Sequence, residues 1–226
     1  MHHGVFRGAK AEHQKMRILI LGESHHISRD DPNDAIALKP ASYETKTVIK
    51  EHITDKNNEK PSLHFFQKIG RSFGFPMETK DEKEEFWKRF FFGNYIDVLC
   101  GIGDCQAKSY LKEPEKRKEM NDALFQFIND NKIDVVVCFG RLVMDHLPSL
   151  NPQYKKEEDG GKLKYGEIFV GGKRDYIGNC TYLPDVEHKN TSVILKKRLE
   201  VYGLRHPSAR GGYNAENYKD VLRKIL

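Results

Sequence analysis

The chain has 226 residues, of which 38% are hydrophobic and 11% aromatic, and its formal net charge at pH 7 is +5. This length favours one domain with a sizeable core, and a modest positive charge is compatible with a polyanionic partner without requiring one. The sequence contains no apolar run of about 18 residues and no secretory leader, so we expect a soluble, cytoplasmic protein rather than a membrane or exported one.

The first predicted strand covers residues 17–21, and after Arg17 it is an uninterrupted aliphatic and β-branched run that ends at Gly22. Such a run is typical of a parallel strand covered on both faces. Residues 1–16 before it are polar, and we expect them to form a loose arm. Polar groups that can accept or donate protons follow the strand directly: Glu23, Ser24, His25 and His26.

A long polar segment follows, interrupted by a short predicted helix around residues 44–53. A second helix is predicted from Leu63 to Phe73, because its apolar residues recur three or four apart. Thr79 and Glu82 have the spacing of a capping box and predict the start of a third helix. Residues 91–96 then favour a strand that places Asn94 near its carboxyl end.

The clearest predicted helix begins at Pro114 and carries an apolar stripe from Met120 to Ile128. A buried strand is predicted at residues 134–139, followed by a helix at residues 141–147. This alternation of strands and helices favours an α/β fold with a parallel sheet.

Residues 151–190 break the alternation, and we interpret them as an insertion within a single domain that spans residues 1–226. Gly171 and Gly172 separate two strand-like runs, residues 167–170 and 174–179, which predicts an inserted β-hairpin. We expect a helix at residues 193–199 and the last strand at residues 200–204. Asn214 is the predicted cap of a terminal helix.

The four cysteines contain no C-x-x-C pair. Cys138 lies in an apolar strand and is expected to be a reduced core residue. Cys100 and Cys105 are close in sequence, but no matching second pair completes a metal site, so we expect neither a metal nor a cofactor.

Three strand ends therefore carry polar residues: Gly22 to His26, Asn94, and His206 to Ser208. In an open α/β sheet, ligands bind beyond the carboxyl ends of the strands. An amide side chain can bond the edge of a nucleobase through its donor and its acceptor, and a histidine held in a tight His-Pro turn can stabilise an oxyanion.

The order of these motifs resembles the uracil-DNA glycosylase superfamily: Gly-Glu after the first strand, Asn after the second, and His-Pro-Ser after the last. The first motif, Gly-Glu-Ser-His, is most similar to that of a bacterial group in the superfamily. Pro61-Ser62-Leu63 also resembles the start of a helix in its best-known branch. The resemblance covers about residues 17–147 and 201–226, and it implies a three-layer α/β/α sandwich around a central four-stranded, mainly parallel sheet.

The resemblance implies an enzyme that flips a uracil or another deaminated base out of DNA and hydrolyses its glycosidic bond. The implied partner is DNA, and we expect a monomer. His206 would stabilise the departing base, with Glu23 and Ser24 as the other catalytic candidates. The base would be bound by Asn94, Gly22, His25 and His26. The DNA backbone would be bound by Pro207, Ser208, Arg205 and Arg210. An aromatic residue is expected to stack on the base, and Phe65, Phe66 and Phe92 are the candidates.

The sequence departs from the best-known branch in two places. Ser24 stands where that branch has an Asp that orients the attacking water, and His26 stands where it has a Tyr that excludes thymine. Glu23 occupies the place of the carboxylate in the iron–sulfur branch, whose four cysteine ligands this chain lacks. Glu23 or backbone groups would therefore position the water.

Two classes of alternative remain open from the sequence. The chain can be a non-catalytic nucleic-acid-binding relative that keeps the pocket and not the chemistry. It can also be a nucleoside hydrolase or a protein-interaction domain on the same scaffold. Each singled-out residue has a structural alternative as well, such as a packed histidine that fixes a turn.

Overall fold

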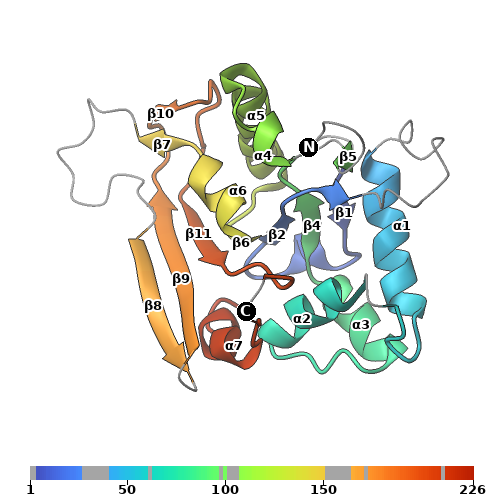
Figure 1. Ribbon diagram of the computed structural model, residues 1–226. Helices are drawn as coiled ribbons and strands as arrows, with labels where there is room; N and C mark the ends of the chain where they lie inside the picture. Colours follow the sequence, from blue (N-terminus) through green and yellow to red (C-terminus); the bar gives the residue numbers. More distant parts are fainter. Residues whose placement is uncertain are drawn as a thin grey trace.

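A computed structural model of the chain describes residues 4–26, 41–60, 63–96, 99–100, 107–150, 164–170, 173–209 and 212–226. In this part of the chain, helices pack around a mixed sheet whose strand order is β1-β4-β2-β6-β11-β9-β8 (Figure 1). The strands of the sheet are β1 (Phe6–Arg7), β4 (Phe91–Asn94), β2 (Ile18–Gly22), β6 (Val135–Phe139), β11 (Leu199–Leu204), β9 (Lys173–Tyr182) and β8 (Lys164–Val170).

Four neighbouring strands, β4, β2, β6 and β11, run parallel to one another. They form the parallel centre that the alternation of strands and helices predicts, and the mixed α/β class is confirmed. The predicted number of four strands is wrong, because the sheet has seven strands among the described residues alone. The additional strands pair antiparallel at its two sides, β1 with β4 and the hairpin β8–β9 with β11.

The predicted hairpin is present, and it is longer than its apolar runs suggest. It continues the sheet rather than standing apart as an insertion, because the second half of β9 pairs with β11 from Ile177 to Tyr182.

The N-terminal residues are not the loose arm that their polarity predicts. Phe6 pairs with Phe92 across the sheet edge, and the amide of Gly8 donates to the carbonyl of Phe90 at 3.0 Å. Ala11 is fully buried in the short 3-10 helix η1 (Ala11–His13). Backbone pairing therefore holds residues 4–16 where side-chain hydrophobicity alone gives little reason for order.

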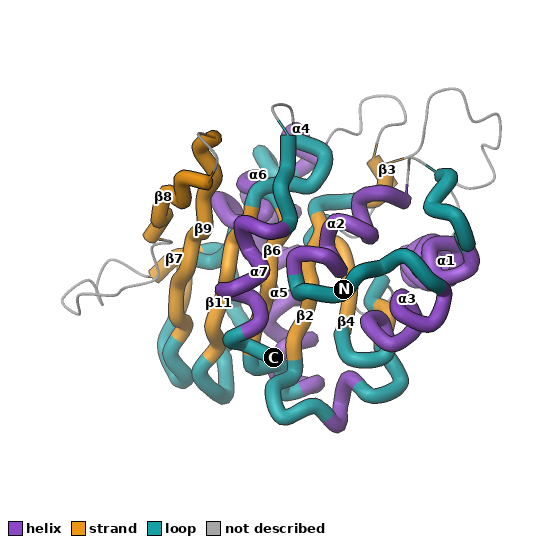
Figure 2. The backbone as a smooth tube through the Cα atoms, turned by 90° about the horizontal axis from the view of Figure 1, so that it is seen from below, coloured by secondary structure: helices purple, strands orange, loops and turns teal. Residues whose placement is uncertain are grey.

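Helices cover both faces of the sheet (Figure 2). They are α1 (Ala41–Thr54), α2 (His64–Ser72), α3 (Lys80–Trp87), α4 (Ala107–Tyr110), α5 (Pro114–Asn131), α6 (Arg141–His146) and α7 (Glu216–Arg223). The capping box predicted for α3 is present: the Thr79 side chain accepts from the amide of Glu82, and the Glu82 carboxylate accepts from the amide of Thr79. Pro114 is in the first turn of α5, as predicted.

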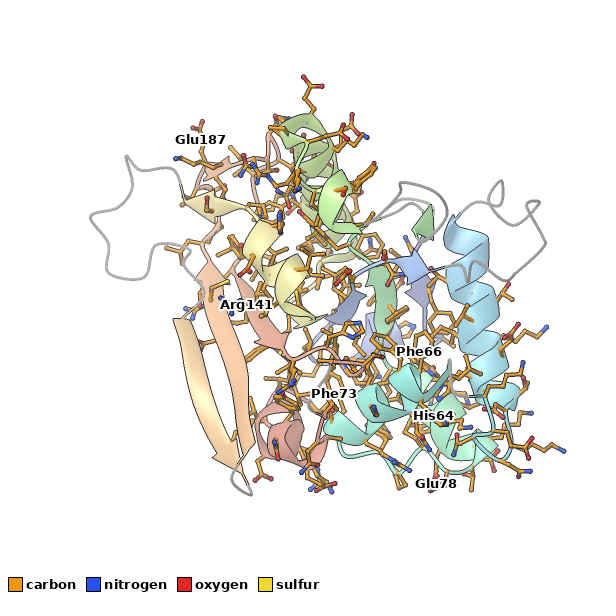
Figure 3. All side chains as sticks on the ribbon, in the orientation of Figure 1. His64, Phe66, Phe73, Glu78, Arg141 and Glu187 are labelled. Atoms are coloured by element: carbon orange, nitrogen blue, oxygen red, sulfur yellow. The ribbon has the colours of Figure 1, made fainter. Side chains whose placement is uncertain are left out.

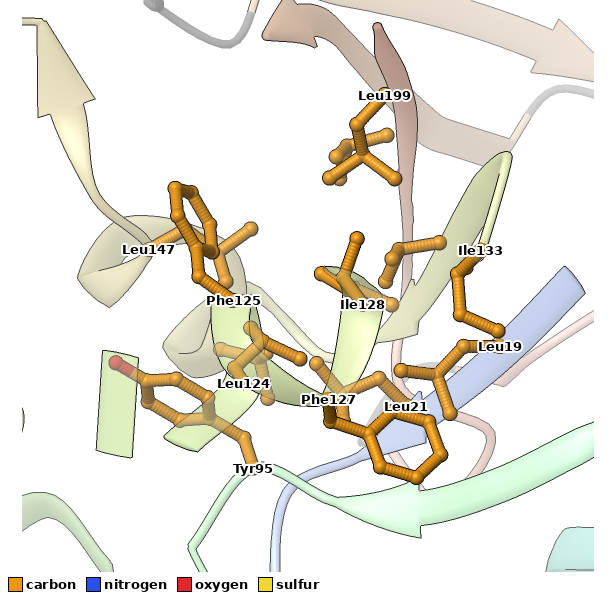
Figure 4. Close-up of a cluster of buried hydrophobic side chains, with 14 of the residues drawn as sticks. Leu19, Leu21, Tyr95, Leu124, Phe125, Phe127, Ile128, Ile133, Leu147 and Leu199 are labelled. Carbon is orange, nitrogen blue, oxygen red and sulfur yellow. The ribbon is translucent and has the colours of Figure 1, made fainter. Parts of the chain in front are cut away.

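Alternate residues of the central strands face two separate cores. Leu19 and Leu21 of β2 pack with Leu124, Phe125 and Ile128 of α5 in one core (Figure 4). The other core contains Ile18 and Ile20 with buried side chains of α1, α2, α3 and α7. In Figure 3, Phe66 and Phe73 extend from α2 and its end toward this core, while Glu78 and Glu187 point away from the protein.

The helix predicted at residues 193–199 is absent. Asn129 of α5 donates to the carbonyl of Ile194 and accepts from the amide of Lys196, so these backbone groups bond a side chain instead of the partners they would have four residues away in a helix. Leu195 is fully buried beside α5. The segment is therefore extended along α5, and β11 begins at Leu199.

Short strand pairs complete the described elements. β7 (Ser149–Leu150) pairs with β10 (His188–Lys189), and β3 (His25–His26) pairs with β5 (Leu99–Cys100). Among the described helices, none combines the length and the apolar character that crossing a membrane requires.

Candidate active site

The carboxyl ends of the four parallel strands meet at one edge of the sheet. Gly22 at the end of β2 lies opposite Asn94 at the end of β4, and Leu204 at the end of β11 lies opposite Phe139 at the end of β6. The loops that carry the predicted site residues therefore leave the sheet side by side, as the parallel topology requires.

Asn94 is held directly against the first motif. Its side chain is 7% exposed, and its Oδ1 atom lies 2.4 Å from the position that a Cβ on Gly22 would occupy. Only a glycine leaves room for the amide here. The amides of Tyr95 and Ile96 donate to the carbonyls of Gly22 and Glu23 at 2.9 and 3.0 Å, which fixes the two exit loops to each other.

Glu23 and His206 both approach Gly140, the residue that follows β6. A Cβ on Gly140 would lie 3.4 Å from Cδ2 of His206 and 3.8 Å from Oε2 of Glu23. Gly140 has φ +130°, a backbone conformation that favours glycine, and its amide donates to the carbonyl of Leu204 at 2.9 Å. The turn at Gly140 thus brings a carboxylate and an imidazole, 183 positions apart in the sequence, into one place.

The tautomer of His206 is set by its own turn. The amide of Ser208 donates to Nδ1 of His206 at 3.1 Å, and the amide of Ala209 donates to the His206 carbonyl at 2.9 Å. A ring nitrogen that accepts a hydrogen bond carries no proton, so the neutral ring carries its proton on Nε2. His206 can therefore donate a hydrogen bond from Nε2 to a developing anion.

The structure separates the three candidate aromatic residues. Phe66 and Phe92 are buried in the core, with ring centroids 5.4 Å apart. Phe65 is half-buried, and its ring centroid lies 5.1 Å from that of His206 with an angle of 35° between the planes. Phe65 is thus the aromatic residue in ring contact with the candidate catalytic histidine.

The remaining predicted residues lie on the same loops. Ser24 and Arg205 are half-buried, Pro207 is buried and Ser208 is exposed. The backbone of His25 and His26 forms β3, while their side chains and Arg210 lie outside the residues that the structure describes. Pro61, Ser62 and Cys105 also lie outside them.

Sequence reasoning missed three residues that support the site. Gly140 looks like an ordinary strand end. Lys68 of α2 donates from Nζ to the carbonyl of Pro207 at 2.9 Å, and Ser72 bonds the Tyr213 hydroxyl at 2.6 Å. The spacing of Phe65, Lys68 and Ser72 at i, i+3 and i+7 indicates one helix face, but nothing in the sequence says which loop that face contacts.

The strongly shifted titratable groups His52 and Cys138 belong to the core and not to this edge. Burial, with a smaller contribution from Lys83, lowers the pKa of His52 from 6.5 to about 3. The Nδ1 atom of His52 accepts from Nε1 of Trp87 at 3.0 Å, which fixes a neutral, structural histidine. Burial also raises the pKa of the Cys138 thiol, in agreement with a reduced, unreactive core residue.

The described residues offer no cluster of three or more His, Cys, Asp or Glu side chains that could hold a metal ion. The described residues that the edge brings together carry a carboxylate, an imidazole and an amide, those of Glu23, His206 and Asn94. A comparison of the chain with models of known protein families gives no match, and neither does a comparison with curated proteins.

Proposed function

We propose that the chain is a DNA glycosylase that flips uracil or another deaminated base out of DNA and hydrolyses its N-glycosidic bond. The observation that carries this proposal is the convergence of Glu23 and His206 at Gly140, next to the strand end where Asn94 packs against Gly22. The helices on both faces of the sheet agree with the α/β/α sandwich that the motif resemblance implies. The enzyme acts as a cytoplasmic monomer without a cofactor.

His206 stabilises the leaving base. When the bond between C1′ and the base nitrogen breaks, its electron pair goes to the base, and negative charge develops on the base carbonyl oxygens. The Nε2–H of His206 donates to one of these oxygens, while the Ser208 amide donates a hydrogen bond to Nδ1 of the same ring. A preorganised donor of this kind contributes about 100- to 1000-fold to a rate.

Glu23 serves as the base for water. The sugar carries oxocarbenium character at C1′, the water oxygen forms the new bond to C1′, and the water proton passes to the Glu23 carboxylate. The departing base anion then takes its proton from solvent. Ser24 provides a backbone amide and a hydroxyl beside this carboxylate, in place of a second charge.

Asn94 selects the base. Its amide oxygen and nitrogen can bond the edge of a pyrimidine that presents one donor next to one acceptor. Phe65, in ring contact with His206, is the candidate for stacking on the flipped base. The backbone of the strand is bound by Pro207 and Ser208, and Arg205 and Arg210 supply positive charge.

The test uses single- and double-stranded oligonucleotides that contain one uracil, hypoxanthine, xanthine or mismatched thymine, followed by alkali to break the strand at abasic sites. The wild-type protein should release at least one of these bases. H206A should lower the release rate by about 100- to 1000-fold, and E23Q by about 100-fold or more. H13A, which alters an exposed histidine of η1, is the matched control and should match wild type.

Three outcomes contradict the proposal. Salt-sensitive DNA binding without base release by the wild-type protein indicates a non-catalytic binder. Release of a base from free nucleosides alone indicates a nucleoside hydrolase. Base release that H206A leaves unchanged excludes the assigned role of His206.

A further inference from the structure

We propose that Lys68 is a positioning residue that sets the tautomer of His206 through the peptide bond between Pro207 and Ser208. This inference rests on the proposed function only for its catalytic consequence. Its structural part concerns the free protein and can be tested without a substrate.

One peptide unit links the two side chains. Its carbonyl oxygen, from Pro207, accepts from Nζ of Lys68 at 2.9 Å, and its amide, from Ser208, donates to Nδ1 of His206 at 3.1 Å. Because a peptide unit is planar, a bond that fixes the direction of the C=O also fixes the direction of the N–H. The hydrogen bond from Lys68 therefore orients the Ser208 amide toward Nδ1 of the imidazole.

The charge on Lys68 adds to this effect. A hydrogen bond from an ammonium group to a carbonyl is stronger than a neutral one, and it polarises the peptide so that its N–H becomes a better donor. Lys68 is half-buried and Pro207 is buried, so the interaction is partly shielded from water. The result is a chain of hydrogen bonds from Lys68 to the peptide and from the peptide to Nδ1, which leaves the proton on Nε2.

One face of helix α2 contacts the segment that contains the His206–Ser208 turn. Phe65, Lys68 and Ser72 lie on one helix face, and they contact His206, Pro207 and Tyr213 respectively. The Phe65 ring restricts the plane of the imidazole, and the Ser72–Tyr213 bond holds the far side of the segment. Both the position and the protonation pattern of His206 therefore depend on one face of α2.

Loss of the Lys68 bond would release the Pro207–Ser208 peptide and weaken the donor to Nδ1. Nδ1 could then carry the proton, and Nε2 would present a lone pair to the leaving base instead of a donor. A lone pair repels the developing anion, so the rate of bond breaking falls while substrate binding changes little.

The experiment compares K68M with wild type, K68R and K80M in the full chain. K68M keeps the apolar stem of the side chain, and K68R keeps its charge. K80M removes an exposed lysine of α3 whose ammonium pairs with Glu84 at 3.4 Å, and it is the matched control. Circular dichroism melts show whether each variant is folded.

The first measurement is the ¹⁵N spectrum of the His206 ring in the free protein, assigned by comparison with H206A. Wild type, K68R and K80M should show the Nε2–H form, and K68M should show a mixture of tautomers. The second measurement is kinetic: K68M should lower kcat for base release by about 10- to 100-fold, with KM and the dependence on salt concentration nearly unchanged, and K68R should restore most of kcat.

An unchanged His206 spectrum in folded K68M overturns the inference, whether or not the protein is a glycosylase. A rise in KM together with a weaker salt dependence, at unchanged kcat, overturns it as well, because that pattern identifies Lys68 as a phosphate contact. A wild-type protein that releases no base contradicts the proposed function alone, and the spectrum still decides whether Lys68 sets the tautomer.

Discussion

Gly140 offers a sharp test of how the candidate site is assembled, through the substitution G140A. The new Cβ would lie at ordinary contact distances, 3.4 Å from Cδ2 of His206 and 3.8 Å from Oε2 of Glu23. Steric overlap is therefore not the main cost. The main cost is the backbone, because at φ +130° a residue with a Cβ is strained.

The size of the effect follows from this strain. A non-glycine residue in a sparsely populated region of φ and ψ costs about 1–3 kcal/mol in the free energy of unfolding. For a domain of this size each kcal/mol lowers Tm by about 2–4 °C, so G140A should melt roughly 2–12 °C below wild type. If the backbone rotates to relieve the strain, Glu23 and His206 move relative to each other, and base release should fall by about 100-fold.

The assays are a thermal melt and the alkali cleavage assay on the same preparation. G74A is the matched control, since Gly74 also has a positive φ, +87°, but it lies beyond the end of α2 where a Cβ would meet the flexible Arg223 side chain. G74A should lose stability and keep its activity below its own Tm. If G140A has the wild-type Tm and the wild-type rate, Gly140 does not constrain the site as argued.

Two further predictions concern stability away from the candidate site. His52 has a pKa of about 3 in the folded protein and about 6.5 when unfolded, so the unfolded chain binds the extra proton between these values. The free energy of unfolding should therefore fall as the pH falls from 6.5 to 3, and H52Q should flatten this slope in urea titrations; equal slopes would refute the assignment. T79A removes the capping box of α3 and should cost about 1 kcal/mol in a thermal melt, whereas T79S should cost little; a T79A melt equal to wild type would show that the box adds nothing.

The local elements of the fold were largely predictable. The run at residues 17–21, the capping box at Thr79 and Pro114 each predict an element that the structure contains, because burial on both faces, capping and proline geometry act over a few residues. The prediction of a helix at residues 193–199 was wrong because a long-range contact, and not a local one, decides this segment. Its backbone is bonded by Asn129 of α5, about 65 residues away in the sequence, which no local pattern reports.

The candidate site divides in the same way. The sequence placed Glu23, Asn94 and His206 at or close to the carboxyl ends of strands, and parallel topology alone then requires them to share an edge of the sheet. It left Phe65, Phe66 and Phe92 equivalent, because burial depends on what packs against a ring and not on the residues beside it in the chain. In the structure, the rings of Phe66 and Phe92 pack against each other in the core, whereas the ring of Phe65 contacts the ring of His206.

The sequence by itself therefore determined which residues are the candidates for chemistry and which strand ends present them, since both follow from residue type and periodicity. Only the tertiary structure decided the support of the site: the positive φ of Gly140 and the contact of Lys68 with the Pro207 carbonyl. These features depend on hydrogen bonds and contacts between segments as much as 139 positions apart, and such contacts arise only when the whole sheet is assembled.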